Sequence, residues 1–517
     1  MTENSTLPMG LTLASAYLHE VEAITVLETP ISWLILTGKW AYKIKKPHCL
    51  PFVDYSTLAK RRFYCQEELR LNRRFTPELY LDVVPVCRVS GQLKVAAEQG
   101  DIVDYAVKMR QFKAGSLWAE LADNGDLQVG AVEALALRLT QVQASLPIAS
   151  AESDWAEPAL IRAWALANFR ELAAILGDRS DDTARLKRLA AWTDNEGWPG
   201  AAVFAQRKRK GAIREGHGDL HLANITCDQG QVVLFDAIEF NPQLRWLDVL
   251  SELAFPVMDL TARQQPALAN HLLNAYLQVT GDYAGLCVYR FYYLYRAMVR
   301  AKVAALAGQS TLLERYLNTA EQVLERRRPV MVVMMGFSGA GKSVLARQLA
   351  AALDMIVLRS DVERKRLYQI PALSRNQLDK SILYSAAASD RVFKHLQEQA
   401  EALLVLGYSV VIDAAMLHEW RRLTFKHLAE KVGAPAWLVQ VTAPEAVLIE
   451  RLKARQTRDD DPSDADVSVM QQQMSNWQAP DEWPKHRCVT VTCADQAQRM
   501  QLIQRLREAM TAGKDSG

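Results

Sequence analysis

The chain has 517 residues, half of them apolar and 23% charged, with 61 Lys or Arg against 59 Asp or Glu. Its length excludes a single hydrophobic core, because domains average about 150 residues and two to four are expected here. Its formal net charge of +2 gives no support to a nucleic-acid or membrane-surface partner on bulk electrostatics alone.

The seven cysteines form no C-x-x-C pair, which is typical of reduced thiols and excludes a disulfide framework or a cysteine zinc site. The first residues, "MTENSTLPMG", show no basic segment followed by an apolar run. The apolar stretches are far shorter than the about 20 residues of a membrane span. We therefore expect a cytoplasmic protein without a membrane partner.

Residues 1–112 have the pattern of a small, sheet-rich α+β unit. The stretch 31–46, "ISWLILTGKWAYKIKK", predicts two short strands around a "TGK" turn. Residues 56–74 then show helical spacing of apolar side chains among Arg and Glu. Strand-like runs follow in "LYLDVVPVCRV" and "DYAVKMRQF".

Helical patterns dominate residues 113–325. They are interrupted by "EGHGDLHLANI" and by "ITCDQGQVVLFD", which predicts a hairpin that turns at 228–230. We expect the basic "RKRK" at 207–210 to be a solvated loop. The aromatic and basic stretch at 289–302 is predicted to be a packed helix whose arginines extend their charged ends to water.

A charged stretch ending in Pro, "ERRRP" at 325–329, marks the expected domain boundary. The next residues, "VMVVMMG", form a continuous apolar run of the kind found in buried parallel strands. Strand and helix patterns then alternate to the end of the chain. We therefore expect an α/β domain with a parallel sheet over residues 329–517.

Residues 336–343, "GFSGAGKS", match the G-x-x-x-x-G-K-[ST] phosphate-binding loop (P-loop) between a predicted strand and a predicted helix. Backbone N–H groups of such a loop turn inward around phosphate oxygens, and the helix N-terminus adds a favourable dipole. The lysine would reach the terminal phosphates, and the serine hydroxyl would bind Mg²⁺. The predicted nucleotide ligands are Gly336, Ser338, Gly339, Ala340, Gly341, Lys342 and Ser343.

Acidic and basic residues follow the P-loop at positions that suit its chemistry. Asp361 ends the strand-like "IVLRSD", where it would orient or deprotonate an acceptor hydroxyl; a helix N-cap is the alternative. Asp413 ends "YSVVID", a position suited to a metal or its water. Arg451 and Arg455 lie one helical turn apart, with Arg458 beyond, and form either a lid on polyphosphate or a solvated helix face.

Over about residues 329–500 the chain resembles the small P-loop kinases of the zeta-toxin, chloramphenicol-phosphotransferase and polynucleotide-kinase group. The resemblance rests on the P-loop, "RSD", "VVID" and the Arg-rich stretch. It implies phosphorylation of a hydroxyl with ATP and Mg²⁺. The second-region motifs of a ring-forming ATPase are not evident, which favours a kinase.

The stretch "HGDLHLAN" places Asn224 five residues after Asp219, the interval between the catalytic Asp and the metal-binding Asn of protein kinases. In that chemistry the acid accepts the proton of the attacking hydroxyl, and the amide oxygen holds Mg²⁺. Asp236, after the apolar run "VVLF", would be the second metal-binding acid. His217 is predicted to brace the loop and not to transfer protons.

A lysine and a glutamate complete this set upstream. Lys43 in "WAYK" is predicted to hold phosphate, in preference to Lys45 on the same face of the strand, because Ala41 then occupies the small position two residues before it. Glu68, in preference to Glu67, is its predicted ion-pair partner on the following helix. A zinc site at the two histidines of the loop is excluded by their spacing and by the lack of a fourth ligand.

These residues resemble the aminoglycoside-phosphotransferase group of kinase-like folds, in which "HGDLHxxN" is the characteristic spelling; the similarity spans about 25–325. With "YKIKKP", "EELRLNRR" and the C-terminal P-loop, the chain resembles the bacterial family of bifunctional aminoglycoside phosphotransferase/ATP-binding proteins. The resemblance implies a bilobal, protein-kinase-like α+β fold over residues 1–325, with lobes at about 1–112 and 113–325, followed by an α/β P-loop domain.

The sequence departs from that group in two respects. No G-x-G-x-x-G covers the nucleotide, and only "LTGKW" offers a phosphate turn. Residues 263–325 hold four acidic and six basic side chains, whereas an aminoglycoside is a polycation that requires acidic partners. Antibiotic phosphorylation is therefore not favoured.

We predict two ATP- and Mg²⁺-dependent phosphotransferase domains, each acting on a hydroxyl of a small molecule. In one alternative the P-loop half phosphorylates the 5′-hydroxyl of a nucleotide or nucleic acid, a partner that is not favoured, and the first half binds it. In another, the first half is a catalytically silent ATP sensor. The sequence makes no prediction of either acceptor or of oligomeric state.

Overall fold

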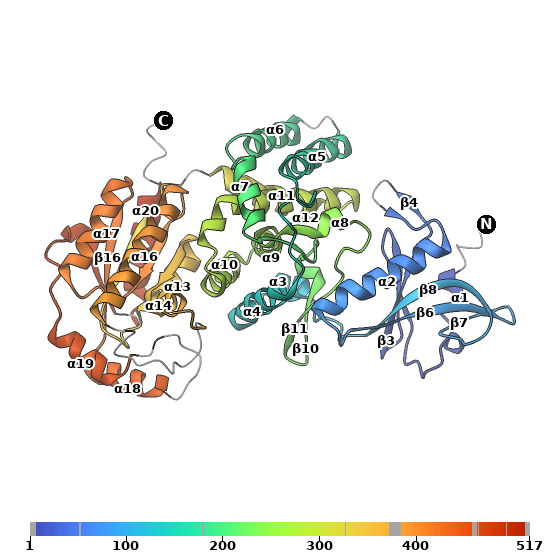
Figure 1. Cartoon of the computed structure of the whole chain (residues 1–517), viewed down its shortest axis with the longest axis horizontal. Coiled ribbons are helices and arrows are strands. Elements are labelled where there is room, and N and C mark those ends of the chain that lie inside the picture. The colour runs from blue at the N-terminus through green and yellow to red at the C-terminus, as the bar shows by residue number, and fades with distance from the viewer. Residues whose placement is uncertain are drawn as a thin grey trace.

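A computed structural model describes residues 7–50, 53–177, 180–325, 327–371, 383, 385–456, 463, 465–492 and 494–511. The chain is elongated, with a sheet-rich N-terminal part, a helical central part and a C-terminal part that holds a second sheet (Figure 1). No helix in these ranges combines the length and the apolar character needed to cross a bilayer.

The N-terminal part is built on a six-stranded antiparallel sheet of order β1-β2-β3-β8-β6-β7. Helix α2 (Leu58–Phe75) packs over β6 and β8, and the Thr57 hydroxyl caps it by accepting a hydrogen bond from Lys60 N. The predicted strand pair and helix are thus confirmed. The sheet strands are β1 (Thr25–Glu28), β2 (Ser32–Leu36), β3 (Trp40–Lys45), β6 (Tyr80–Val89), β7 (Gln92–Val95) and β8 (Asp101–Arg110), and the short elements are α1 (Leu7–Gly10), η2 (Ala14–Ala16), β4 (Cys49–Leu50) and β5 (Val53–Asp54).

The central part is helical, with two small antiparallel sheets, β10-β11 and β12-β9. The predicted hairpin is β10-β11, in which Asp228 pairs with Gln231. Its helices are α3 (Trp118–Asn124), α4 (Val129–Ser145), α5 (Pro158–Leu176), α6 (Ser180–Asp194), α7 (Ala201–Arg209), α8 (Pro242–Arg245), α9 (Val249–Ala262), α10 (Pro266–Thr280), α11 (Leu286–Leu306) and α12 (Ser310–Glu321). The strands and 3-10 turns are β9 (Ile213–Glu215), β10 (Ile225–Asp228), β11 (Gln231–Leu234), β12 (Trp246–Asp248), η3 (Leu222–Asn224), η4 (Tyr283–Gly285) and η5 (Gln322–Leu324).

The tetrapeptide 207–210 is not the solvated loop that we expected. Arg207 lies in α7 and is buried, with Nη2 2.8 Å from Asp248 Oδ1 and 2.9 Å from Asp282 Oδ2. Lys208 is also buried, and only the last two residues of the four are exposed. The expectation was wrong because the counter-charges come from distant parts of the chain. The aromatic stretch at 289–302 is, as predicted, a packed helix, α11. The expected extension of its arginine ends to water is wrong for Arg296, which is buried and donates to Gly218 O and Ser251 O, each at 3.3 Å.

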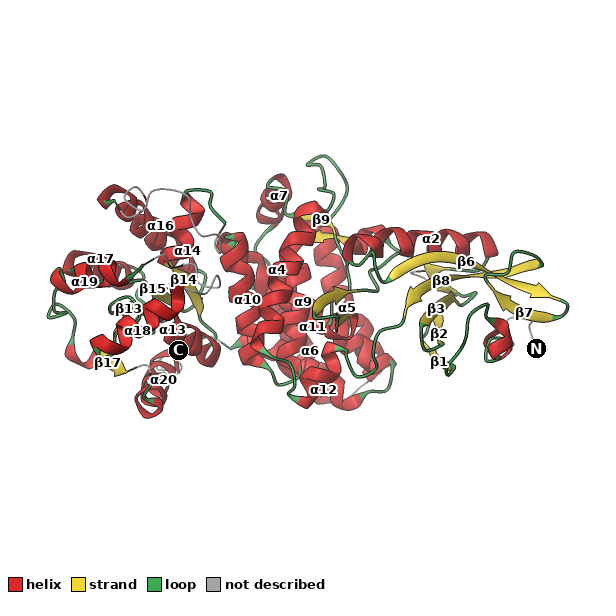
Figure 2. Cartoon of the chain, turned by 90° about the horizontal axis from the view of Figure 1, so that it is seen from below, coloured by secondary structure: helices red, strands yellow, loops and turns green. Residues whose placement is uncertain are grey.

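The C-terminal part holds a five-stranded parallel sheet of order β14-β15-β13-β16-β17, as predicted. Helices surround the sheet (Figure 2). All five residues of β13 are buried. The strands are β13 (Met331–Met335), β14 (Ile356–Arg359), β15 (Val410–Asp413), β16 (Ala436–Thr442) and β17 (Cys488–Thr492). The helices are α13 (Lys342–Leu353), α14 (Ser360–Leu367), α16 (Ala386–Val405), α17 (Glu419–Lys431), α18 (Glu445–Gln456), α19 (Val467–Ser475), η6 (Lys485–Arg487) and α20 (Gln496–Thr511).

Helix α10 of the central part pairs with the edge of this sheet. Asn274 Oδ1 accepts a hydrogen bond from Val357 N at 2.7 Å, and its Nδ2 donates to Met355 O at 3.0 Å. Asn270 Nδ2 donates to the same carbonyl at 3.1 Å. An uncovered edge strand leaves backbone donors and acceptors unpaired, so these two amides close the outer edge of β14.

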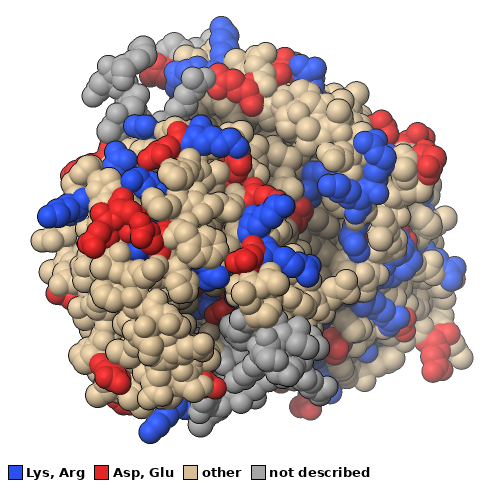
Figure 3. Space-filling model, turned by 60° about the vertical axis from the view of Figure 1, so that its left-hand side comes forward, with Lys and Arg blue, Asp and Glu red and all other residues tan. Residues whose placement is uncertain are grey.

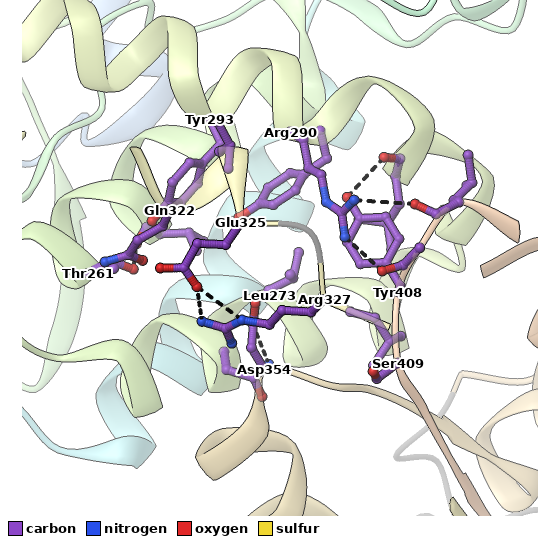
Figure 4. Close-up of a pocket in the computed structure, with 18 of the residues that line it drawn as sticks. Thr261, Leu273, Arg290, Tyr293, Gln322, Glu325, Arg327, Asp354, Tyr408 and Ser409 are labelled. Atoms are coloured by element: carbon purple, nitrogen blue, oxygen red, sulfur yellow. Dashed lines mark hydrogen bonds and ion pairs between the residues drawn. The ribbon is translucent and has the colours of Figure 1, made fainter. Parts of the chain in front are cut away.

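A second contact between the two halves is made by Arg290 of α11 (Figure 4). Its Nη2 donates to Gly407 O at 2.9 Å, and its guanidinium carbon lies 4.2 Å from the centre of the Tyr408 ring. Beside it lies a cavity of about 740 Å³ whose lining includes none of the predicted site residues. On the face shown in Figure 3, acidic and basic side chains are interspersed.

Candidate nucleotide-binding sites

The first candidate site begins with the two lysines of β3. Lys43 and Lys45 point to the same face of the strand, because successive side chains alternate. Lys43 Nζ lies 2.9 Å from Glu68 Oε1 on α2 and also contacts Asp236 Oδ1. Burial alone would lower the pKa of Lys43, but Asp236 and Glu68 raise it well above its usual range. The structure thus brings together Lys43, Glu68 and Asp236, and the lysine is charged.

Asp219 lies in the loop between β9 and η3, after Gly218, whose φ of +86° is readily adopted only by glycine. Its carboxylate is 3.4 Å from His221 Nε2. Burial alone would raise the pKa of Asp219, but His221 and the more distant Arg300 lower it below its usual range. The carboxylate is therefore ionised at neutral pH and can accept a proton.

Asn224 lies in η3, and its side chain contacts the backbone of Asp219. Its Nδ2 donates to Asp219 O at 2.9 Å. Among the described residues no donor forms a hydrogen bond to Asn224 Oδ1. This oxygen atom is therefore available to bind a cation. The roles of both residues in binding or catalysis stay predictions.

His217 holds this loop against the segment that carries Asp236. Its Nε2 donates to Phe235 O at 2.7 Å, and its Nδ1 accepts a hydrogen bond from Asp219 N at 3.3 Å. Because one ring nitrogen donates and the other accepts, the ring is neutral. Burial lowers the pKa of His217, which also favours the neutral form of the ring. His217 therefore braces the loop.

Asp236 lies two residues beyond the end of β11, slightly later than the strand end that we predicted. Its φ of +66° is in the left-handed region, which is uncommon for residues other than glycine and is enriched at functional sites. Tyr80 accepts a hydrogen bond from Asp236 N at 3.0 Å, and Asn72 Oδ1 accepts one from Ala237 N at 2.9 Å. With its backbone held in this way, the side chain is 42% exposed.

The second candidate site is the loop between β13 and α13. Gly336 has a φ of +144°, and a Cβ there would lie 2.4 Å from Val441 O. Gly339 and Gly341 also have positive φ, at +84° and +100°. Three glycines in this conformation let the backbone turn tightly around an anion. The predicted ligand Ala340 is buried inside this turn.

Lys342 and Ser343 are the first residues of α13. Lys342 Nζ donates to Phe337 O at 3.0 Å, so the lysine is folded over its own loop. Burial lowers the pKa of Lys342, and the nearby Asp413 and Asp361 oppose that effect. Ser338 N donates to Gln473 Oε1 of α19 at 2.9 Å.

The two predicted acids of this half lie at the carboxyl edge of the sheet. Asp413 ends β15, where its Oδ2 is 3.3 Å from Arg359 Nε on the neighbouring strand. β14 ends at Arg359, and Asp361 lies in the first turn of α14. The N-cap of this helix is Arg359, so the cap alternative for Asp361 is wrong.

The two described arginines of α18 do not form a purely solvated face. Arg451 Nη1 donates to Gly339 O at 3.2 Å and to Ala340 O at 3.4 Å, so it packs against the P-loop. Arg455 contacts Ala465 O. Arg458 lies outside the described residues.

Sequence reasoning missed one part of the first site. Lys45, Glu239 and Tyr55 form a buried network around Glu68: Lys45 Nζ contacts Glu239, and Tyr55 OH donates to Glu239 Oε1 at 2.5 Å. The alternation of lysines in "YKIKKP" was its only sequence signal, because Glu239 lies 194 positions from Lys45.

Comparison with known proteins agrees with the P-loop assignment. Residues 331–480 match the AAA domain family (AAA_33). An uncharacterized protein of Mycobacterium tuberculosis (strain ATCC 25618 / H37Rv) is 28% identical over 466 residues, which cover 88% of this chain and 91% of the relative. An uncharacterized protein of Mycobacterium bovis (strain ATCC BAA-935 / AF2122/97) matches to the same extent. The C-terminal half therefore contains a P-loop domain.

Several solved structures are similar to parts of the chain. The GDP and kanamycin complex of APH(2")-IIia is 12% identical, with a TM-score of 0.38, and the match covers 62% of this chain and 98% of that one. A gluconokinase from Sinorhizobium meliloti 1021 is 23% identical, with a TM-score of 0.24, over 35% of this chain and 98% of that one. Chaetomium thermophilum Kti12 in complex with ADP-AlF3 is 16% identical, with a TM-score of 0.29, over 35% and 98%.

Proposed function

We propose that the protein is a phosphotransferase with two ATP sites, each of which transfers the γ-phosphate to a hydroxyl of a small molecule. The observation that carries the proposal is the position of Lys43, which contacts both Glu68 and Asp236 beside the loop of Asp219 and Asn224. A cation, two metal-type ligands and a base are the groups that kinase chemistry requires.

The oxygen atoms of the first site fit Mg²⁺. This ion prefers hard oxygen ligands and is commonly held by one or two protein groups together with substrate phosphates. Asp236 offers a partly exposed carboxylate, and Asn224 offers an amide oxygen. When bound, Mg²⁺ would offset the negative charge of the phosphates.

In the proposed step of the first site, Asp219 accepts the proton of the acceptor hydroxyl. The acceptor oxygen forms a bond to the γ-phosphorus, the bond from that phosphorus to the bridging oxygen breaks, and ADP leaves. Lys43, positively charged, moves from Asp236 to the phosphates. His217 keeps Asp219 at a constant position relative to Asp236 through its two ring hydrogen bonds.

In the second site, we assign nucleotide binding to the backbone N–H groups of residues 336–343 and to Lys342. Ser343 and Asp413 would hold Mg²⁺, and Asp361 would serve the acceptor hydroxyl. Arg451 already contacts the P-loop backbone, and Arg455 follows one turn later on α18. Both are assigned to the nucleotide side of the site.

A small acceptor that is not a polycation fits the surroundings of Asp219. Arg296 of α11 donates to Gly218 O at 3.3 Å, and Arg300 is close enough to affect the pKa of Asp219. Positive side chains behind the base disfavour an aminoglycoside. The interspersed charges of Figure 3 likewise give no support to a nucleic-acid acceptor.

The test is incubation with γ-labelled ATP and a metabolite extract. We expect the parent protein to form labelled products, and Asp219→Ala and Lys342→Ala each to lose a different one. If Asp219→Ala keeps every product while its first half still binds ATP, the first half is a sensor. Labelling of a 5′-hydroxyl oligonucleotide that is lost in Lys342→Ala would favour an end kinase. Absence of any labelled product contradicts the proposal.

A further inference from the structure

Lys45, the second lysine of β3, is fully buried and contacts two acidic side chains and a tyrosine. Its Nζ lies 2.7 Å from Glu68 Oε2, contacts Glu239 Oε1 and lies 3.5 Å from Tyr55 OH. The Tyr55 ring centre is 4.9 Å away. The ammonium group therefore lies between two carboxylates, and its buried charge is paired.

Glu68 is shared between the two lysines. Lys45 forms a hydrogen bond to Oε2, whereas Lys43 reaches Oε1 at 2.9 Å as an ion pair. Among the described residues Oε1 is buried and has no partner with hydrogen-bond geometry. Burial alone would raise the pKa of Glu68, but the two lysines lower it below its usual range. Glu68 is thus an anion that both lysines contact, one at each carboxylate oxygen.

This sharing matters because Lys43 must change partners when a nucleotide binds. The cluster holds two positive and three negative side chains, namely Lys43, Lys45, Glu68, Asp236 and Glu239. Without Lys45, Glu68 would keep Lys43 as its only lysine partner and would hold it more strongly. Because the Glu68 side chain is fully buried, this attraction is strong, and Lys43 would be retained by its carboxylate.

We propose that Lys45 is a positioning residue that neutralises Glu68 and thereby allows Lys43 to bind the phosphates of the nucleotide. The inference rests on the proposed role of Lys43 as a phosphate ligand. Glu239 is the counter-ion that keeps Lys45 in place, and Tyr55 fixes Glu239 by donating to its Oε1 at 2.5 Å. A different role for the same contacts is a tether that only joins β3 to the segment after Asp236.

The test measures affinity for a fluorescent ATP analogue with Mg²⁺ in a Lys342→Ala background, where only the first site binds. We expect Lys45→Met to raise Kd by about tenfold or more. This is the effect of losing one charge-assisted hydrogen bond, here the one between Lys43 and a phosphate. The matched control is Lys46→Met, which removes the next lysine; its Nζ contacts Glu28 and Thr29 O, away from Glu68. We expect that control to keep the Kd of the background protein.

Two double variants separate the positioning role from a tether, with the melting temperature of the ligand-free protein as a second readout. Adding Glu68→Gln to Lys45→Met should lower Kd again, because the carboxylate that would retain Lys43 in the absence of Lys45 is then removed. Adding Glu239→Gln should restore the melting temperature and leave Kd high. If Lys45→Met alone does not fold, the double variant Lys45→Met/Glu239→Gln carries the same test through its raised Kd.

The outcomes distinguish this inference from the proposed function. An unchanged Kd in Lys45→Met, or recovery of Kd by Glu239→Gln and not by Glu68→Gln, overturns the inference alone. If the Lys342→Ala background itself binds no nucleotide, the proposed function of the first site falls, and the inference falls with it.

Discussion

Asn274 Oδ1 lies 2.7 Å from Val357 N, so a side chain of the first half completes the hydrogen bonding of an edge strand in the second half. That strand, β14, leads directly into the helix that carries Asp361. The position of a candidate catalytic acid in one half therefore depends on a helix of the other. The two halves are structurally joined at this point, although their candidate sites lie apart.

Asn274→Ala is expected to destabilise the protein. The substitution leaves Val357 N–H without its partner in a buried position, and an unsatisfied buried backbone group costs about 1–3 kcal/mol. The measurement is the free energy of unfolding in urea. Asn124→Ala, at the exposed end of α3, is the matched control and should lie near the parent. Equal stability of the two variants would contradict the edge-capping role.

Arg207→Met is expected to cost about 3–5 kcal/mol of unfolding free energy, because it leaves the buried Asp248 without its cation. Lys210→Met changes the same basic tetrapeptide at an exposed position and should have little effect. Chemical denaturation of both variants checks the difference. A similar loss in both would mean that the tetrapeptide acts through its total charge and not through the buried pair.

The spacing of Asp219 and Asn224 and the pattern of the P-loop could be predicted because each depends on neighbouring residues of one turn. The strands around them could be predicted for the same reason, from alternation and apolar runs. The ion pairs of Arg207 and the sharing of Glu68 could not. Both depend on residues that the tertiary fold brings together from distant parts of the chain, and local sequence patterns do not identify such partners.

One predicted detail changed for a local reason. β14 ends earlier than its apolar pattern suggested, because Ser360 already begins α14. Asp361 consequently lies on a helix and not at a strand end, although still at the carboxyl edge of the sheet. In the sequence, the preference for Lys43 over Lys45 rests only on the small side chain of Ala41, two residues before Lys43. The structure shows that both lysines contact Glu68.

His217→Gln is expected to reduce the loss of stability in acid. Burial lowers the pKa of His217, so as pH falls through about 6.5 the unfolded chain binds a proton that the folded chain excludes. This group therefore lowers stability in acid and has no such effect above that range. Gln keeps an Nε2 donor for Phe235 O and cannot titrate.

The check is the free energy of unfolding in urea at about pH 7.5 and about pH 5.5, on either side of the ordinary pKa of histidine. The parent should lose more stability between the two values than His217→Gln does. Parallel pH dependences in the two proteins would show that His217 is not kept neutral by burial.

Gly336→Ala is expected to abolish nucleotide binding at the second site while the first site still binds. The added Cβ would lie 2.4 Å from Val441 O at a φ of +144°, so the loop must move away from β16. Binding of the ATP analogue in a Lys43→Met background isolates the second site. Gly130→Ala, where a Cβ meets nothing within 4 Å in α4, is the control and should bind normally. Normal binding by both variants would contradict the role of the loop.

The most direct test of two nucleotide sites in one chain is the stoichiometry of a non-hydrolysable ATP analogue, measured with Mg²⁺ by equilibrium binding. We predict two molecules bound per parent chain, one in Lys43→Met, one in Lys342→Ala and none in the double variant. A parent chain that binds a single molecule, lost entirely in Lys342→Ala, would contradict the assignment of a nucleotide to Lys43, Glu68 and Asp236.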